Sequence, residues 1–438
     1  MRKLAVVSLG CAKNLVDTEI ILGQLLGAAC ELTHDFSAAE IILVNTCGFI
    51  EDAKKESIQQ ILEMARFKNP AVGSCQRLIV AGCLVHRYAR ELESQMPEVD
   101  VWLGLADLGN ASRVLEGTEK GIGLAGEPFL NNENLPRFQV TLKHTAYVKI
   151  AEGCSHRCAY CAIPLIKGKF RSRHPDAVIQ EIATLVANGT REINLIAQDI
   201  TMYGYDLAPR LTLPQLITEI LRQAKPQWLR LLYAYPSGIT QPLLELMAQE
   251  ESICKYLDLP IQHIHPRILK RMNRPDSPAL IKQRLDLIRT VIPEAALRTT
   301  LLVGFPGETV AEFEELCRFV TAERFRHLGV FSYSKEEGTA AFQMKPQIAK
   351  AVREQRRSKL MRIQQKISRE LQAAQIGKDM PVLVDRNLEA AKAIGRSQFQ
   401  APDVDGVIYL AGAQEPGSFV RAKITGSDDY NLSAEISG

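Results

Sequence analysis

The sequence predicts an α/β protein of three parts, and three observations lead to this fold class. Strand-length apolar runs alternate with helical segments through residues 1–115. After a polar linker at 116–139, a second series of six such runs extends through 140–372. From 373 to 438 the pattern changes to short β-runs separated by turn residues. We therefore expect an N-terminal α/β domain with a parallel sheet, a central partial (β/α)6 barrel and a C-terminal small antiparallel β-barrel.

Three buried strands and three helices account for the first part. The strands are expected at 4–9, 41–44 and 78–81, and the helices at 14–26, 51–66 and 87–95. Continuous apolar strands that alternate with helices indicate a parallel sheet covered on both faces. The acidic residues Glu51 and Asp52 open the second helix, where they complement its dipole.

The second part begins after a turn-rich stretch at 131–136. Its strands are expected at 145–150, 192–196, 229–232, 256–259, 297–303 and 327–331. Six strands are fewer than the eight of a closed (β/α)₈ barrel, so we expect an open one. A long helix at 350–375 precedes the last part, whose strands are expected at 380–384, 406–410 and 419–424.

Composition and charge set broad limits. The 438-residue chain has 53 basic and 50 acidic residues, and its net charge of +3 argues neither for nor against a nucleic-acid partner. No apolar run reaches the roughly 18 residues of a membrane span. The short apolar stretch near the N-terminus fits a first strand better than a signal peptide, so we expect a cytoplasmic protein. Ten cysteines in a reducing compartment favour metal binding over disulfides.

The strongest motif is Cys154-x₃-Cys158-x₂-Cys161, in a loop after an expected strand. Such a loop can supply three thiolates to a [4Fe–4S] cluster, which ordinarily has four cysteine ligands. The fourth iron is then open, and it can chelate the amino and carboxylate groups of S-adenosylmethionine (SAM). Zinc is the alternative, with His156 as a fourth ligand, although this spacing is unusual for zinc.

A second set of cysteines follows the strands of the N-terminal part. Cys11, Cys47 and Cys83 each come directly after an expected strand, and successive members are 36 residues apart. The carboxyl ends of parallel strands lie on one edge of a sheet, so we expect these thiolates to converge on a second [4Fe–4S] cluster. Glycines beside each cysteine allow the backbone to approach a bulky group.

Other candidate residues are weaker, and no catalytic residue is expected beyond the cluster ligands. Strand-end loops and the cysteine loop supply expected cofactor contacts at Tyr160, Gln198, Asp199, Gly304 and Glu308. Four cysteines without a partner at ligand spacing are expected to be structural: Cys30, Cys75, Cys254 and Cys317. His263 and His265 are expected to belong to a strand-end loop. Lys167, Lys169, Arg171 and Arg173 are expected to be solvated, with an anion-binding role as the alternative.

With both cysteine sets in view, the chain resembles the methylthiotransferase family of radical-SAM enzymes over essentially its whole length. The segments at 8–17, 45–54, 333–339 and 401–406 are similar to the branch that modifies ribosomal protein S12. The resemblance implies an N-terminal methylthiotransferase domain, a radical-SAM barrel and a C-terminal TRAM domain.

The resemblance also implies two [4Fe–4S] clusters, SAM as cofactor, an electron donor, and S12, alone or on the ribosome, as substrate. The implied reaction inserts a methylthio group at the β-carbon of an aspartate in S12, after a SAM-derived radical removes hydrogen. The alternatives are methylthiolation of a tRNA adenosine and a non-catalytic, metal-bearing ribosome- or RNA-binding protein. From residue 378 onward, six basic and nine acidic residues give a net charge of −3, which disfavours tRNA.

Overall fold

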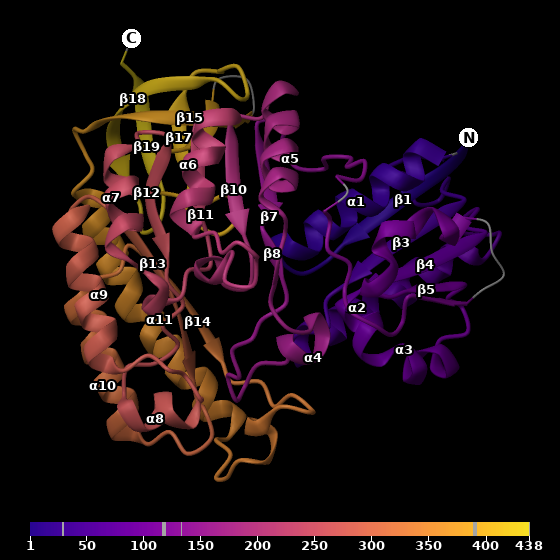
Figure 1. Ribbon diagram of the computed structural model, residues 1–438, viewed down its shortest axis with the longest axis horizontal. Helices are drawn as coiled ribbons and strands as arrows, with labels where there is room; N and C mark the ends of the chain where they lie inside the picture. The colour runs from indigo at the N-terminus through magenta and orange to yellow at the C-terminus, as the bar shows by residue number, and fades with distance from the viewer. Residues whose placement is uncertain (29, 116–119, 133, 389–391, 438) are drawn as a thin grey trace.

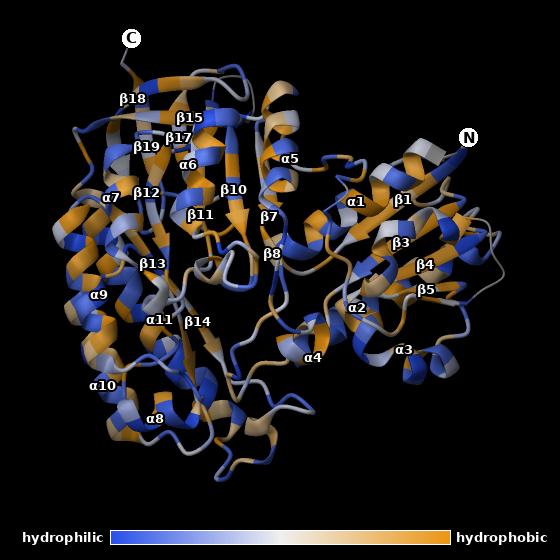
Figure 2. Ribbon diagram, viewed as in Figure 1, coloured by the Kyte–Doolittle hydropathy of each residue, from blue (hydrophilic) through white to orange (hydrophobic). Residues whose placement is uncertain are grey.

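The computed structural model describes residues 1–28, 30–115, 120–132, 134–388 and 392–437. The described residues form three domains, each built around its own sheet (Figure 1). Much of each strand in the two parallel sheets is hydrophobic, whereas the covering helices carry hydrophobic and hydrophilic residues on different sides (Figure 2). None of the helices among these residues is both long and apolar enough to cross a membrane.

The N-terminal domain has a six-stranded parallel sheet in the order β2-β1-β3-β4-β5-β6. The strands are β1 (Arg2–Ser8), β2 (Cys30–Leu32), β3 (Ile41–Thr46), β4 (Arg77–Gly82), β5 (Val101–Leu103) and β6 (Gly121–Ile122). The helices are α1 (Ala12–Ala28), α2 (Glu51–Ala65) and α3 (Cys83–Gln95), with the 3-10 segments η1 (Arg66–Lys68) and η2 (Leu105–Leu115). Because α1 and η2 cover one face and α2 and α3 the other, the central strands are buried on both sides.

The central domain is an open six-stranded parallel barrel in the order β14-β13-β12-β11-β10-β7. The strands are β7 (Thr145–Lys149), β10 (Glu192–Ile196), β11 (Trp228–Leu231), β12 (Ile253–Asp258), β13 (Ala296–Val303) and β14 (His327–Ser332). The outer face is covered by α5 (Pro175–Ala187), α6 (Leu213–Gln223), α7 (Gln241–Gln249), α9 (Pro278–Val291), α10 (Val310–Glu323) and α11 (Lys350–Ala373). The expected partial (β/α)6 barrel is thus confirmed.

Short elements lie at the ends of these strands. They are the two-stranded sheet of β8 (Ala151–Glu152) and β9 (Arg171–Ser172), the helices α4 (Ile163–Lys167) and α8 (Pro266–Arg271), and the 3-10 segments η3 (Ile200–Met202), η4 (Pro236–Gly238) and η5 (Ala340–Gln343). β8 and β9 pair antiparallel and flank the loop that carries the second set of cysteines.

The C-terminal domain is a closed five-stranded barrel in the order β15-β16-β17-β19-β18. Its strands are β15 (Asp379–Asn387), β16 (Lys392–Arg396), β17 (Ile408–Ala411), β18 (Phe419–Ser427) and β19 (Leu432–Ile436). The pairings are antiparallel except for β17 and β19, which run parallel and close the barrel.

The inner face of the open barrel is covered by the other two domains. Tyr147 and Tyr256 from the barrel strands join one apolar cluster with Val16 and Ile20 of α1 and with Leu383 of the C-terminal barrel. In Figure 1, α1 accordingly lies between the N-terminal sheet and the strands β7 and β8. A face that an eight-stranded barrel would fill with its own side chains is here an interdomain core.

The linker expected at 116–139 is only partly a linker. Residues 121 and 122 form β6, which pairs in parallel with β5 and so belongs to the N-terminal sheet. A strand of two residues, one of them glycine, is too short to leave an apolar pattern in the sequence. Residues 116–119 and 133 of the expected linker lie outside the described residues.

Candidate functional site

The first set of cysteines lies at the carboxyl edge of three adjacent strands. Cys11 follows β1 and directly precedes α1, Cys47 follows β3, and Cys83 is the first residue of α3, directly after β4. Because β1, β3 and β4 are neighbours in the sheet, the three strand ends open on one point of its edge.

Glycines interlock the three cysteine loops. A Cβ atom added at Gly10 would lie 3.0 Å from Cys47 Cβ and 3.3 Å from Cys47 Sγ. One added at Gly48 would lie 2.8 Å from Leu84 N and 2.9 Å from the carbonyl carbon of Cys83. Each cysteine loop therefore touches the next through a glycine that leaves no room for a side chain.

The environment of these thiols favours an anionic group. The amino ends of α1 and α3 point at the site, where a helix dipole stabilises negative charge. Burial raises the pKa of the Cys83 thiol to about 12, and the charge of Lys167 opposes that rise. The thiols must lose their protons to bind metal, so helix ends and a nearby cation are what a thiolate site requires.

The second set lies in the loop between β8 and α4. Cys154 donates its backbone N–H to Gly168 O over 3.1 Å, and Cys161 donates to Cys158 O over 3.0 Å. Gly153 has φ +77°, and a Cβ there would lie 2.1 Å from Lys169 O. The loop is thus wound tightly, and burial raises the pKa of Cys154 to about 11 and that of Cys161 to about 12.

Aromatic and charged side chains surround this loop. His156 Nε2 lies 2.7 Å from Asp199 Oδ2, and the His156 ring stacks on Tyr235 with centroids 4.1 Å apart. Tyr235 Oη lies 3.6 Å from Cys158 Sγ. The buried guanidinium of Arg274 lies 4.1 Å from the Tyr235 ring centroid and donates to Tyr160 Oη over 3.4 Å. The contacts of Tyr235 and Arg274 cannot be predicted from spacing in the sequence, because both residues lie more than 70 residues from the cysteine loop.

Each cysteine set has one ligand fewer than an ordinary [4Fe–4S] site, which has four cysteines. Across the described residues, no group of three or more His, Cys, Asp or Glu side chains is arranged to hold one metal ion. Each set offers three thiols, which fits a [4Fe–4S] cluster that keeps one iron open.

Three of the five expected cofactor contacts lie beside the second set of cysteines. Asp199 is buried at the end of β10, where it binds His156 and caps η3 by accepting from Thr201 N over 2.9 Å. Its neighbour Gln198 donates to Glu152 Oε1 over 3.2 Å. Tyr160 lies within the cysteine loop itself. A small cavity of about 90 Å³ borders Cys154, His156 and Asp199.

The loop after β13 holds the other two expected cofactor contacts, Gly304 and Glu308. A Cβ at Gly304 would lie 2.2 Å from Arg353 Cγ, so a side chain of α11 occupies that space. The buried carboxylate of Glu308 accepts the backbone N–H groups of Gly304 and Phe305. Both residues therefore stabilise this loop, and their contact with a cofactor stays a prediction.

His263 and His265 belong to a loop, as expected. His263 is fully buried, and burial lowers its pKa to about 3. His265 Nδ1 accepts from Arg267 N over 3.3 Å and so caps α8. The four cysteines expected to be structural are all buried and free.

The basic residues behind the cysteine loop are not all solvated, which corrects the expectation. Lys167 is buried and binds Asp17 Oδ2 over 3.0 Å, while the neighbouring Lys149 binds Asp17 and Glu152. Although burial opposes charge, Lys149 and Lys167 lower the pKa of Glu152 to about 2. This charge-balanced group joins α1 to β7, β8 and α4, and its members come from both domains.

Arg173 is also buried, and it pairs with Glu181 over 2.5 Å. Glu181 lies eight residues after Arg173, on α5, the helix that follows Arg173. Arg171 pairs with Glu127 over 3.1 Å, whereas no ion pair involving Lys169 is found among the described residues. The expected solvation therefore holds for Lys169 alone.

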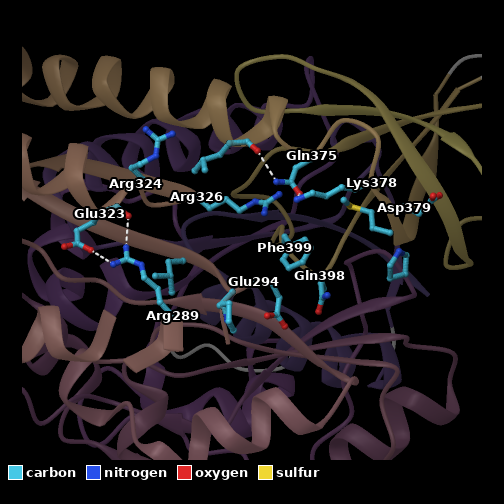
Figure 3. A pocket seen from close by; sticks show the side chains of 16 residues that line it. Arg289, Glu294, Glu323, Arg324, Arg326, Gln375, Lys378, Asp379, Gln398 and Phe399 are labelled. Carbon is cyan, nitrogen blue, oxygen red and sulfur yellow. Dashed lines mark hydrogen bonds and ion pairs between the residues drawn. The ribbon is translucent and has the colours of Figure 1, made fainter. Parts of the chain in front are cut away.

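A large cavity lies away from both cysteine sets. It measures about 680 Å³ and lies between the amino ends of β13 and β14 and the C-terminal barrel. Figure 3 shows its charged lining, in which Arg289 binds Glu323 and Arg326 lies beside Phe399. It contains no cysteine and lies at the strand ends opposite to those that carry the cysteine sets.

Sequence comparison with known families divides the chain as the structure does. Residues 3–104 match the uncharacterized protein family UPF0004, residues 148–320 match the radical SAM superfamily, and residues 376–436 match the TRAM domain. The first match covers most of the N-terminal sheet, the second most of the open barrel, and the third the closed barrel.

Relatives are similar over the whole chain. The chain is 47% identical to the ribosomal protein uS12 methylthiotransferase RimO of Geotalea uraniireducens, covering 99% of this chain and 98% of that protein. It is 42% identical to RimO of a Thermoanaerobacter species, covering 99% of this chain and all of that protein.

Solved structures share the fold at low sequence identity. TsrM from Kitasatospora setae, a radical SAM methyltransferase, superposes with a TM-score of 0.54 at 15% identity, covering 75% of this chain and 73% of that one. OxsB, a cobalamin-dependent SAM radical enzyme, gives a TM-score of 0.53 at 12% identity, covering 83% of this chain and 56% of that one.

Proposed function

Because the chain belongs to the RimO family of ribosomal protein uS12 methylthiotransferases, we propose that it adds a methylthio group to the β-carbon of an aspartate in uS12. In this proposal Cys154, Cys158 and Cys161 hold the [4Fe–4S] cluster that binds SAM. A further set, Cys11, Cys47 and Cys83, holds a second [4Fe–4S] cluster.

The observation that carries the proposal is the pairing of two three-cysteine sets across one domain interface. Lys13, two residues after Cys11, donates to the carbonyl oxygen of Ala197 at the end of β10, over 3.2 Å. Asp199, two residues further on, binds His156 of the other cysteine loop. The two sets thus border the same space at the carboxyl edge of the barrel, where barrel enzymes bind their substrates.

When bound, the clusters and SAM supply the radical and sulfur chemistry, and the protein supplies positions and shelter. Tyr235 and His156 cover the cysteine loop, and Arg274 keeps both tyrosines beside it in place. Asp199 and Gln198 present polar groups at the barrel edge beside that loop, and we propose them, with Tyr160, as SAM contacts. The buried ion pairs between α1 and β7 fix the second set of cysteines relative to the first.

The substrate is proposed to be a protein. A domain that grips tRNA phosphates is typically basic, whereas the region from 378 has a net charge of −3. The family name points to uS12, which is present on ribosomes in the cytoplasm, and we propose the cytoplasm as the location. The reaction also needs an electron donor.

Iron and labile sulfide per chain, measured after anaerobic reconstitution, test the two-cluster arrangement. We expect about eight irons in the wild-type protein and about four in each of two triple variants, as two four-iron clusters require. The variants replace Cys11, Cys47 and Cys83, or Cys154, Cys158 and Cys161, by Ala. Cys254→Ala, at a buried cysteine remote from both sets, is the matched control and should keep all eight.

Mass spectrometry of uS12 and of tRNA after incubation with SAM and a reductant tests the substrate. The expected result is a methylthio adduct on one aspartate of uS12 and none on tRNA. A wild-type protein that holds only about four irons would contradict the second cluster. An adduct on tRNA alone would contradict the substrate.

A further inference from the structure

Lys13 is a buried lysine, and two features of its surroundings disfavour its positive charge. Its residue is 8% exposed, and it lies in the first turn of α1, where the helix dipole disfavours a cation. Two neighbouring buried lysines, Lys149 and Lys167, are neutralised by Asp17 and Glu152. No carboxylate of the described residues lies within ion-pair distance of Lys13. The charges of Cys11, Asp258 and Glu152 act on Lys13 only from beyond ion-pair distance. A buried ammonium group without a direct ion-pair partner can take one from a ligand.

The ammonium group is held at one place by the barrel. Lys13 Nζ donates to Ala197 O over 3.2 Å at the end of β10, and it lies 3.2 Å from the centroid of the Tyr233 ring just after β11. An ammonium has three N–H donors, and these contacts leave at least one free. That donor is at the carboxyl edge of the barrel, near Cys11.

Tyr233, whose ring faces the Lys13 ammonium group, has an energetically unfavourable backbone conformation. Tyr233 has φ +66°, which is uncommon for a residue with a side chain. Its backbone is fixed on both sides, since Tyr233 N donates to Asp258 Oδ2 over 3.2 Å and Tyr233 O accepts from Ile200 N over 3.1 Å. Strain of this kind persists where the surroundings impose it, and it is frequent at binding sites.

We propose that Lys13 binds the side-chain carboxylate of the substrate aspartate. This inference rests on the proposed function and names a specificity residue for it. The carboxylate supplies the direct ion-pair partner that Lys13 lacks, and a lysine ammonium binds it as a point charge. The β-carbon that receives the methylthio group is bonded to the carboxyl carbon, so a grip on the carboxylate places the reacting carbon between the two cysteine sets.

The test compares two forms of uS12 with three variants of the enzyme. One form is native, and in the other the modified aspartate, located by mass spectrometry, is replaced by Asn. The enzymes are wild type, K13M, which removes the charge, and K13R, which keeps it. Lys282→Met, at an exposed lysine of α9, is the matched control. Affinity is measured by titration without reductant, and kcat/KM by methylthiolation.

We expect wild type and Lys282→Met to prefer the Asp form by about 100-fold, as for loss of a buried charge partner. K13M should treat the two forms alike, and K13R should keep part of the preference. Iron content and SAM cleavage without uS12 are measured in all four proteins, and Lys282→Met should equal wild type in both. The preference for the Asp form is a ratio within one enzyme, so an altered iron content in a Lys13 variant does not change it.

An undiminished preference for the Asp form in K13M would overturn the assignment of Lys13 and leave the proposed function intact. If K13M does not fold, K13R tests the assignment instead. An unchanged preference of K13R for the Asp form would also contradict it, because the proposed contact depends on the position of the ammonium group. Wild-type enzyme that neither binds nor modifies either form would refute the proposed function, and the inference would fall with it.

Discussion

Gly48 lies where the loop after β3 meets the first turn of α3. A methyl group there would meet backbone atoms of Cys83 and Leu84 at 2.8–2.9 Å, and backbone cannot move aside as a flexible side chain can. We expect Gly48→Ala to displace Cys83 and to lower the iron content by about four per chain, because the proposed cluster at Cys11, Cys47 and Cys83 would lose a ligand. Overpacking of this kind costs about 1–3 kcal/mol of stability.

Gly27→Ala is the matched control, because a Cβ at Gly27 in α1 would meet nothing within 4 Å. Its iron content should equal that of wild type. Equal iron content in Gly48→Ala would show that the glycine contact does not position Cys83.

Glu308 predicts a pH dependence of stability. Burial raises the pKa of Glu308 from 4.5 to about 7, against the opposing charge of Arg356 at 3.3 Å. The unfolded chain then releases its proton at lower pH than the folded one, so this group's contribution falls between about pH 4.5 and pH 7. The full loss is about 3 kcal/mol.

The variant Glu308→Gln does not titrate, so its stability relative to wild type should be higher at pH 8 than at pH 5. Urea unfolding at the two pH values measures this difference. His263, 4.0 Å from Glu308, titrates well below this range, and Glu312 is already ionised, so neither produces the same change. A constant difference between the two proteins would contradict the shifted pKa.

At the scale of elements, the segment 333–339 fastens the N-terminal domain to the barrel. Glu336 is buried, and its Oε2 lies 2.8 Å from Lys54 Nζ of α2 and 3.0 Å from Arg87 Nη1 of α3. Arg87 also donates to Glu337 O over 2.7 Å. This loop after β14 therefore binds both α2 and α3 of the N-terminal domain, and α3 begins at Cys83 of the first cysteine set.

Glu336→Gln would leave Arg87 buried without its counter-ion, a change that costs about 3–5 kcal/mol. We expect faster proteolytic cleavage between the two domains and a lower Tm. Glu219→Gln, which breaks an exposed pair with Arg222 on α6, is the control and should leave both unchanged. Identical cleavage rates in the two variants would contradict the fastening role.

Most of the elements were predictable from the sequence, because long apolar runs and helical periodicity are local signals. The strands β2, β5, β6, β8, β9, β16 and β19 were not predicted. Five of them have only two or three residues, and the other two lie in the C-terminal barrel among polar residues. The helix α3 begins at Cys83 rather than at the expected residue 87, because its first turn lies against the cysteine site and lacks an amphipathic pattern.

The two cysteine sets could be predicted because spacing places them on strand ends. Their surroundings could not be. Tyr235 reaches the cysteine loop from the loop after β11, Arg274 from the loop after α8, and Arg353 reaches Gly304 from α11. The ion pairs between Asp17, Lys149 and Lys167 bring together residues from two domains, and such long-range pairings leave no local pattern.

At the scale of the whole molecule, buried ion pairs hold the C-terminal barrel against the open barrel. Arg396 of β16 binds Asp385 through two nitrogens at 2.8 Å and reaches Glu192 of β10 at 2.8 Å. Asp405 accepts from Tyr256 Oη over 2.8 Å and pairs with Arg298. The segment 401–406 thus closes the inner face of the barrel at the end away from the cysteines.

Arg396→Met should destabilise the protein by about 3–5 kcal/mol, because two buried carboxylates lose a partner. Hydrogen exchange should rise in β15–β19 and in β7 and β10 together, since the pair joins both domains. Arg421→Met, at an exposed arginine of β18, is the control. An exchange increase confined to the C-terminal barrel would contradict the coupling.

The fastening by Glu336 also has a consequence for the order of assembly during synthesis. The N-terminal sheet and all of its cysteines leave the ribosome first, yet their partner Glu336 follows 282 residues after Lys54. Domains generally fold as units in the order in which they emerge. The N-terminal domain therefore folds before its partner Glu336 is available. The contacts of α2 and α3 with the barrel can form only after residue 336 of 438 has been made, so the interface between the two domains is completed late in translation.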